Sequence, residues 1–220
     1  MARHITEKDN FAYLTIGLVL LLFVSALVDN FHITLGGHVI EAAVTMTLII
    51  GVWSIRTERR WFRTGFGLIA AIVVIFLAGL FLDLAGLYMI HLVLLLCFLV
   101  LSVWVAAKQA LFAGRVEANT IIGAVCIYLL LGIIWAVLYV FVNLALPGSF
   151  HGVSATDPRD CFHALLYFSF VSLTTQGFGD ISAALPLAQF LTYTEGIVGQ
   201  LYMAIVVASL VGIRISSRQQ

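Results

Sequence analysis

The residues best suited to bind a ligand form the run Thr174–Asp180, in which two threonines precede Gln-Gly-Phe-Gly-Asp. Gly177 and Gly179 lie two positions apart, and glycine adopts left-handed backbone conformations at little cost. Backbone that alternates between ordinary and left-handed conformations aims consecutive carbonyl oxygens at one axis, where they replace the hydration shell of a cation. The Thr175 hydroxyl would add a further oxygen. The run therefore predicts a site for a dehydrated cation, made of protein oxygens and requiring no cofactor.

A short apolar stretch, Cys161–Leu173, stands before this run. At about 1.5 Å per residue it is too short to cross roughly 30 Å of hydrocarbon, so it predicts a helix that enters the membrane and turns back. The negative end of such a half-helix would point at the cation site and favour positive charge. Irregular backbone at membrane depth is tolerated only where it is buried in protein or lines an aqueous cavity, so this stretch predicts a pore.

The composition places these elements in a membrane protein. Hydrophobic residues make up 62% of the 220 positions and charged residues 10%, whereas soluble domains carry about 25% charged residues. The mean hydropathy is +1.11. We expect an all-α membrane protein of six transmembrane helices plus the re-entrant pore helix and a selectivity-filter loop. The predicted spans are Phe11–Val28, His38–Ile55, Thr64–Leu82, Leu84–Ala106, Thr120–Val142 and Leu187–Ile213.

The basic residues predict the orientation of these spans. Ten of the eleven lie before the first span, after the sixth, or in the loops after the second and fourth, and Arg159 alone lies on the other side. Since basic residues concentrate on the cytoplasmic side, we expect both termini in the cytoplasm of a multi-pass protein of the cell membrane. The formal net charge of zero argues against nucleic acid as a partner and leaves the lipid bilayer.

The linker Lys108–Asn119 divides the chain into a predicted four-helix unit, 1–112, and a predicted pore domain, 113–220. The four-helix unit has the layout of a voltage sensor, but its fourth span contains His91 and no Arg or Lys. Moving one charge through 100 mV yields only about 2.3 kcal/mol, so a sensor needs several charges, and we expect no voltage gating. A neutral, packed His91 is favoured over a proton sensor or a haem ligand, because no suitably placed second histidine is evident.

The run Thr174–Asp180 resembles the TTVGYGD signature of tetrameric potassium channels. The similarity covers residues 113–213, with further matching segments at 121–139, 147–150 and 199–212, which resemble bacterial six-transmembrane members with the two-transmembrane type of pore domain. It implies a homotetramer that conducts potassium passively, with this run as the selectivity filter. The implied K⁺ ligands are the Thr175 hydroxyl and the backbone carbonyls of Thr175, Gln176, Gly177 and Phe178.

Two residues depart from the family pattern. Gln176 replaces the usual Val or Ile, and Phe178 replaces the usual Tyr. The family geometry implies that both side chains point into the packing behind the filter, where a buried amide needs hydrogen-bond partners. Two interpretations stay open. Either Gln176 finds such partners and the filter selects potassium, or the changes loosen the filter and give a weakly selective monovalent cation channel.

The resemblance assigns further roles in the pore domain. Tyr167 on the half-helix would bond Asp180 and brace the filter, with a solvated carboxylate as the alternative. Gly199 is either the hinge of the inner helix or a position of close helix packing. The central cavity would be lined by residues at i, i+3 and i+7 of the same span, namely Gln200, Met203 and Val207.

Glu195 is an acid inside the sixth span, so we expect it to be paired or to face water, as a structural or proton-sensing group behind the filter. Cys97, Cys126 and Cys161 show no metal-ligand spacing, and no nucleophile–base constellation indicates an enzyme. Seven residues follow Ile213, and if the chain ends there we expect gating to come from the membrane, the filter or a separate subunit. The rival classes are a secondary transporter, which usually shows inverted repeats, and a non-conducting regulatory subunit with the channel fold.

Overall fold

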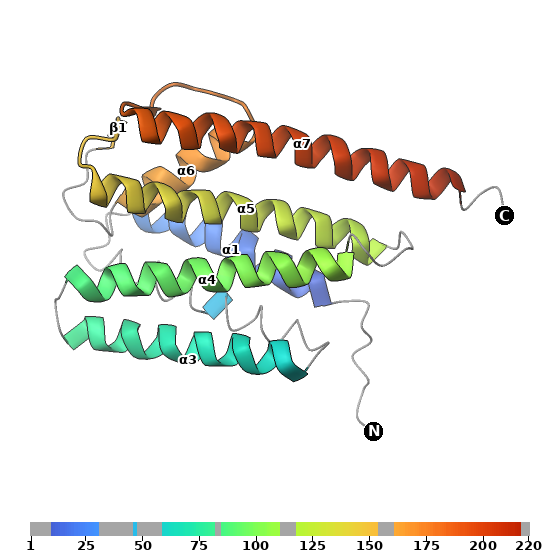
Figure 1. Cartoon of the computed structure of the whole chain (residues 1–220), viewed down its shortest axis with the longest axis horizontal. Helices are drawn as coiled ribbons and strands as arrows, with labels where there is room; N and C mark the ends of the chain where they lie inside the picture. Colours follow the sequence, from blue (N-terminus) through green and yellow to red (C-terminus); the bar gives the residue numbers. More distant parts are fainter. Residues whose placement is uncertain are drawn as a thin grey trace.

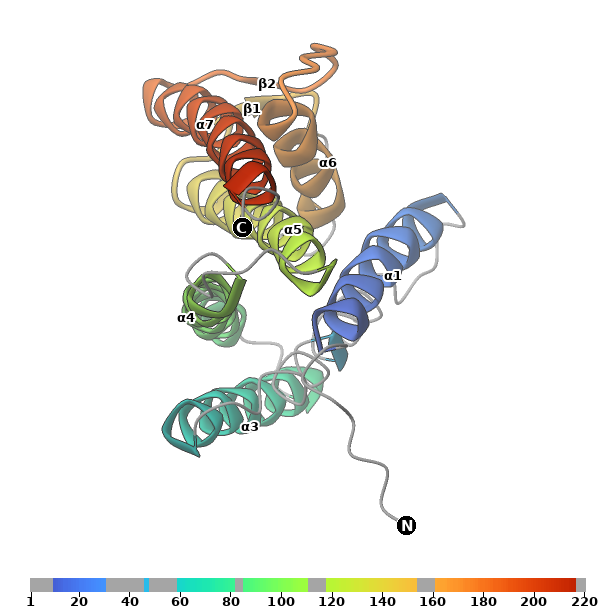
Figure 2. The same ribbon diagram turned by 90° about the vertical axis from the view of Figure 1, so that its right-hand side faces the viewer.

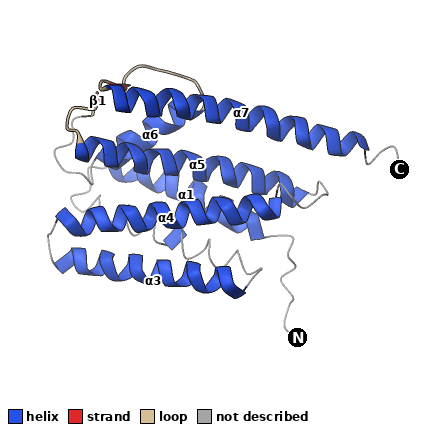
Figure 3. Cartoon of the chain, viewed as in Figure 1, coloured by secondary structure: helices blue, strands red, loops and turns tan. Residues whose placement is uncertain are grey.

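The computed structural model describes residues 10–30, 46–47, 59–81, 85–110, 118–153 and 161–216. Within these ranges the chain is helical apart from one two-stranded sheet and the connecting turns (Figure 1, Figure 3). The predicted second span, His38–Ile55, lies outside the described residues except for Met46 and Thr47, and so does most of the linker Lys108–Asn119. The helices are α1 (Asn10–Asn30), α3 (Arg59–Phe81), α4 (Ala85–Ala110), α5 (Ala118–Ala145), α6 (Cys161–Leu173) and α7 (Pro186–Ser216).

Among the described residues, three helices are long and apolar enough to cross a membrane, through the segments Gly86–Gln109 of α4, Thr120–Ala145 of α5 and Pro186–Ser209 of α7. No proline interrupts their apolar runs, and Pro186 opens α7 at a position where the missing N–H costs nothing. α1 and α3 carry shorter apolar segments, Phe11–Leu27 and Arg63–Gly79. The described part of the chain thus supplies three of the six predicted spans at full length.

α5 occupies the centre of the bundle (Figure 2). It packs against α1, α4, α6 and α7, and α3 packs against α4. The short α6 has the bounds predicted from the sequence, Cys161–Leu173, and contacts both α5 and α7. Two long helices therefore determine where the C-terminal end of α6 lies.

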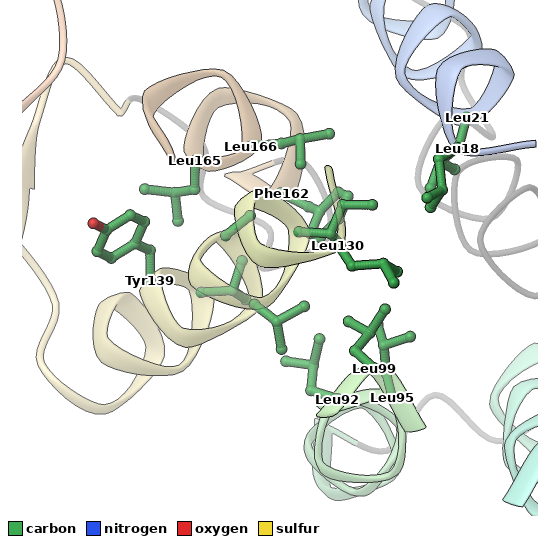
Figure 4. Packing of buried hydrophobic residues seen from close by; sticks show 14 of the residues in the cluster. Leu18, Leu21, Leu92, Leu95, Leu99, Leu130, Tyr139, Phe162, Leu165 and Leu166 are labelled. Carbon is green, nitrogen blue, oxygen red and sulfur yellow. The ribbon is translucent and has the colours of Figure 1, made fainter. Parts of the chain in front are cut away.

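The hydrophobic core follows α5 (Figure 4). Leu130 and Tyr139 of α5 pack with three buried residues of α6, Phe162, Leu165 and Leu166. The same core continues into the leucines of α1 and α4, which include Leu18, Leu21, Leu92, Leu95 and Leu99. α6 is thus anchored in the core that also contains residues of α1 and α4.

A small sheet joins the connection after α5 to the segment before α7. β1 (Phe150–His151) and β2 (Ser182–Ala183) pair antiparallel, with Phe150 opposite Ala183. Phe150 also forms a three-ring cluster with Tyr139 and Phe168, with centroid separations of 5.3–5.5 Å. The sequence did not predict this sheet, because strands of two residues carry no periodic pattern. The β1–β2 sheet connects the segment after α5 and the segment before α7 to the core.

We expect Leu165→Ala to destabilise the fold. Leu165 is 0% exposed, and truncating a buried leucine removes packing and leaves a cavity at a cost of about 2–5 kcal/mol. Leu77→Ala is the control, since Leu77 on α3 is 48% exposed and surface changes usually stay within about 0.5 kcal/mol. Thermal unfolding in detergent measures both variants. Equal unfolding temperatures would contradict the core described above.

Candidate ion-binding site

α6 ends in a cap that turns the chain into the run Thr174–Asp180. The Gln176 N–H donates to the Val171 carbonyl at 2.9 Å, and the Thr175 N–H donates to the Ser172 carbonyl at 3.0 Å. These two bonds form a Schellman motif, which requires left-handed backbone just beyond the helix and usually places glycine there. Thr175 takes that position with a φ of 58°. Such a conformation costs a β-branched residue roughly 1–3 kcal/mol, and strain of this kind is retained where function requires it.

The handedness of the backbone alternates along the run. Thr175, Gly177 and Gly179 have φ values of 58°, 58° and 82°. The intervening Gln176 and Phe178 are not in the positive-φ region. Alternation of this kind turns successive peptide groups so that their polar atoms face one side of the chain. The two glycines therefore lie where left-handed backbone is needed.

The backbone carbonyls at the C-terminal end of α6 and those of the run Thr174–Asp180, called the loop below, differ in their hydrogen-bond partners. The last four carbonyls of a helix have no partner within it, yet those of residues 170–172 accept hydrogen bonds from the N–H groups of residues 174–176. The fourth, on Leu173, accepts from the Tyr128 hydroxyl at 3.2 Å. Within the described chain, the backbone carbonyls of residues 175–179 accept no such bond. A row of unpaired carbonyls on ordered backbone is available to a cation.

The side chains of residues 174–180 are exposed in the single chain, and Phe178 is 67% exposed. The packing that the resemblance implies around Gln176 and Phe178 is therefore not supplied by the described residues of their own chain. Asp180 has a partner on α6, because its carboxylate accepts a hydrogen bond from the Tyr167 hydroxyl. The fold thus brings together the two residues predicted to brace the loop.

Gly199 lies where α7 touches the end of α6. A Cβ atom at Gly199 would overlap the Leu173 carbonyl oxygen, whereas one at Gly196 would stand 3.7 Å from the Ser172 carbonyl oxygen, an ordinary contact. Close packing against α6 therefore accounts for glycine at 199, one of the two roles left open by the sequence. The predicted cavity residues lie on the same helix and are exposed in the single chain: Gln200, Met203 and Val207.

Glu195 is a buried acid on α7. Its side chain is 0% exposed and lies within hydrogen-bond distance of the hydroxyls of Tyr139 on α5 and Ser169 on α6. Sequence reasoning identified Glu195 but neither partner, because no local pattern links residues 56 and 26 positions apart. His91 is 4% exposed on α4, which packs against α3 and α5. No cluster of His, Cys, Asp and Glu able to hold a metal ion occurs in the described ranges.

The site combines a half-helix too short to span a membrane, a loop of carbonyls unpaired among the described residues, and two flanking apolar helices. Residues 127–214 match the model of a protein family described as ion channel. That segment contains α6, the loop and most of α5 and α7. No curated protein and no solved structure matches the chain. The family match indicates an ion channel and favours ion transport over catalysis.

We expect Gly199→Ala to destabilise the packing of α7 against α6 and Gly196→Ala to preserve it. Both changes improve helix propensity by about 1 kcal/mol, but only the first drives a methyl group into the Leu173 carbonyl. Thermal unfolding in detergent separates them. If Gly199→Ala instead raised the unfolding temperature as Gly196→Ala does, close packing would not explain the glycine.

Proposed function

We propose that this chain is one subunit of a homotetrameric, potassium-selective channel that conducts K⁺ passively across the cell membrane. The row of unpaired carbonyls at residues 175–179, on backbone of alternating handedness, carries this proposal. Protein oxygens must surround a dehydrated K⁺ to replace its water shell. One loop approaches the ion from one side only. Closure of the ring therefore needs several copies around a symmetry axis, and four fits the signature that the run resembles.

The proposed K⁺ ligands are oxygens of the loop itself. The C-terminal end of α6 carries the negative end of its dipole and precedes the loop directly, which favours a cation over an anion. The capping bonds occupy the carbonyls of α6, so the oxygens offered to the ion begin with the loop. These are the Thr175 hydroxyl and the carbonyls of Thr175, Gln176, Gly177 and Phe178.

The exposed surface of the pore unit supports assembly with further copies. The loop side chains Gln176 and Phe178 are open to solvent in the single chain. α7 also exposes many large apolar side chains, which pack against neighbouring subunits or face the cavity and lipid in the proposed tetramer: Leu187, Phe190, Tyr193, Ile197, Leu201, Met203, Ile205 and Val207. In this proposal residues 1–112 form a supporting unit without voltage sensitivity, residues 113–220 form the pore, and both termini are cytoplasmic.

Potassium flux through purified protein in liposomes tests conduction. We expect K⁺ uptake that barium blocks, since Ba²⁺ resembles dehydrated K⁺ in size but carries twice the charge and occupies the same oxygens for longer. Liposomes with Gly177→Ala protein are the matched control, because alanine disfavours the φ of 58° at that position. Wild-type liposomes that remain impermeable would instead support a non-conducting regulatory subunit.

Gln176→Val tests selectivity. We expect the reversal potential of the wild type in mixed K⁺ and Na⁺ to follow the K⁺ gradient, and valine to preserve or sharpen this preference because it removes an amide that needs partners when packed. The measurement is the bi-ionic reversal potential of both proteins in planar bilayers. A reversal near zero for wild type and variant alike would favour the weakly selective cation channel.

Tyr167→Phe tests the proposed brace. Loss of its hydroxyl frees the Asp180 carboxylate, so we expect faster decay of the K⁺ current, and Asp180→Asn to have the same effect. The double variant should decay no faster than either single one, because both changes remove one interaction. Tyr13→Phe is the control, as Tyr13 is 52% exposed on α1. Additive effects of the two changes would show that Tyr167 and Asp180 act separately.

A further inference from the structure

Three polar side chains from three helices meet in the core of the pore unit. Tyr139 of α5, Ser169 of α6 and Glu195 of α7 are each 0% exposed. Ser169 Oγ lies 2.6 Å from Glu195 Oε1, and the Tyr139 hydroxyl donates to Glu195 Oε2. Ser169 Oγ also lies 2.7 Å from the carbonyl oxygen of Gly132 on α5. The cluster is separate from the residues proposed to contact K⁺.

The protons available to Ser169 determine the charge of Glu195. A serine hydroxyl has one proton to donate, and a backbone carbonyl only accepts. If Ser169 donates to Gly132, its contact with Glu195 is a hydrogen bond only when Glu195 itself carries the proton. If Ser169 donates to an ionised Glu195 instead, two oxygen atoms 2.7 Å apart, those of Ser169 and Gly132, share no proton. Only a protonated Glu195 allows both the Ser169–Gly132 contact and the Ser169–Glu195 contact to be hydrogen bonds.

The surroundings of Glu195 agree with a neutral acid. Its two hydrogen-bond partners, Tyr139 and Ser169, are neutral hydroxyl groups. Tyr128, a further titratable group on α5, donates to the Leu173 carbonyl. A buried charge is retained in proteins when it is paired or coordinates a metal, and otherwise the group becomes neutral. The described contacts of Glu195 supply no positive charge.

We propose that Glu195 is a protonated carboxylic acid that acts as a positioning residue for the loop. It donates from Oε1 to Ser169, accepts at Oε2 from Tyr139, and so locks α6 to α5 and α7. Ser169 lies just before the carbonyls of residues 170–172, which hold the first N–H groups of the loop. A shift of α6 at Ser169 therefore moves the carbonyl row. The protonation of Glu195 does not depend on the proposed function. Its effect on conduction rests on the proposed function.

Glu195→Gln and Glu195→Ala test the two parts of this proposal. A glutamine amide replaces a protonated acid bond for bond, since its NH₂ group donates to Ser169 and its oxygen accepts from Tyr139. We expect Glu195→Gln to match the wild type in unfolding temperature and K⁺ flux. Alanine leaves the Tyr139 and Ser169 hydroxyls without this partner, so we expect a loss of flux of about tenfold or more. Equal damage by glutamine and alanine would overturn the proposal.

Infrared spectroscopy of the purified protein reads the proton directly. We expect the wild type to show the carbonyl stretch of a buried protonated acid, with little exchange in D₂O, and Glu195→Gln to lack it. Asp180→Asn is the control, because an exposed carboxylate contributes to a different band and its loss leaves the acid band in place. Absence of the acid band from the wild type would overturn the assignment. A wild type that shows the band but conducts no K⁺ would refute the proposed function and leave Glu195 protonated.

Discussion

A run of peptide carbonyls without hydrogen-bond partners among the described residues is the feature on which the arrangement of α5, α6 and α7 depends. Backbone oxygens in a folded protein are nearly always paired, so an ordered segment that leaves residues 175–179 free must be held by everything around it. In the Schellman cap, the N–H groups of Thr175 and Gln176 donate to carbonyls of α6. Thr175 adopts a left-handed conformation to form this cap. The strain is offset by the packing of α6.

That packing converges on α5. Tyr139 joins the aromatic cluster with its ring and the Glu195 cluster with its hydroxyl, while Tyr128 satisfies the last free carbonyl of α6. α7 closes the arrangement, because Gly199 permits contact with Leu173 and Tyr202 donates to the Ala124 carbonyl of α5 at 2.6 Å. α5 and α7 therefore both contribute packing contacts and hydrogen bonds to the unit that positions the loop.

Much of this unit could be predicted from local sequence. An apolar stretch too short to span predicted α6 to its observed ends, and the spacing of Gly177 and Gly179 predicted the alternation of backbone handedness. The β1–β2 pair and the partners of Glu195 could not be predicted, because they join residues far apart in the chain with no periodic signal. The left-handed Thr175 was also missed, since its conformation follows from the cap and threonine by itself disfavours it.

The sequence by itself determined the apolar character of the protein and the backbone conformations open to the loop. The apolar content excludes a soluble surface, and this follows from composition alone. The spacing of the glycines limits the backbone conformations that Thr174–Asp180 can adopt, and this follows from local sequence. Only the tertiary structure decided why Gly199 is glycine and how Glu195 is tolerated in the core. Those answers depend on the Leu173 carbonyl and on the Ser169 hydroxyl, two groups of α6 that meet α7 only when the two helices pack together.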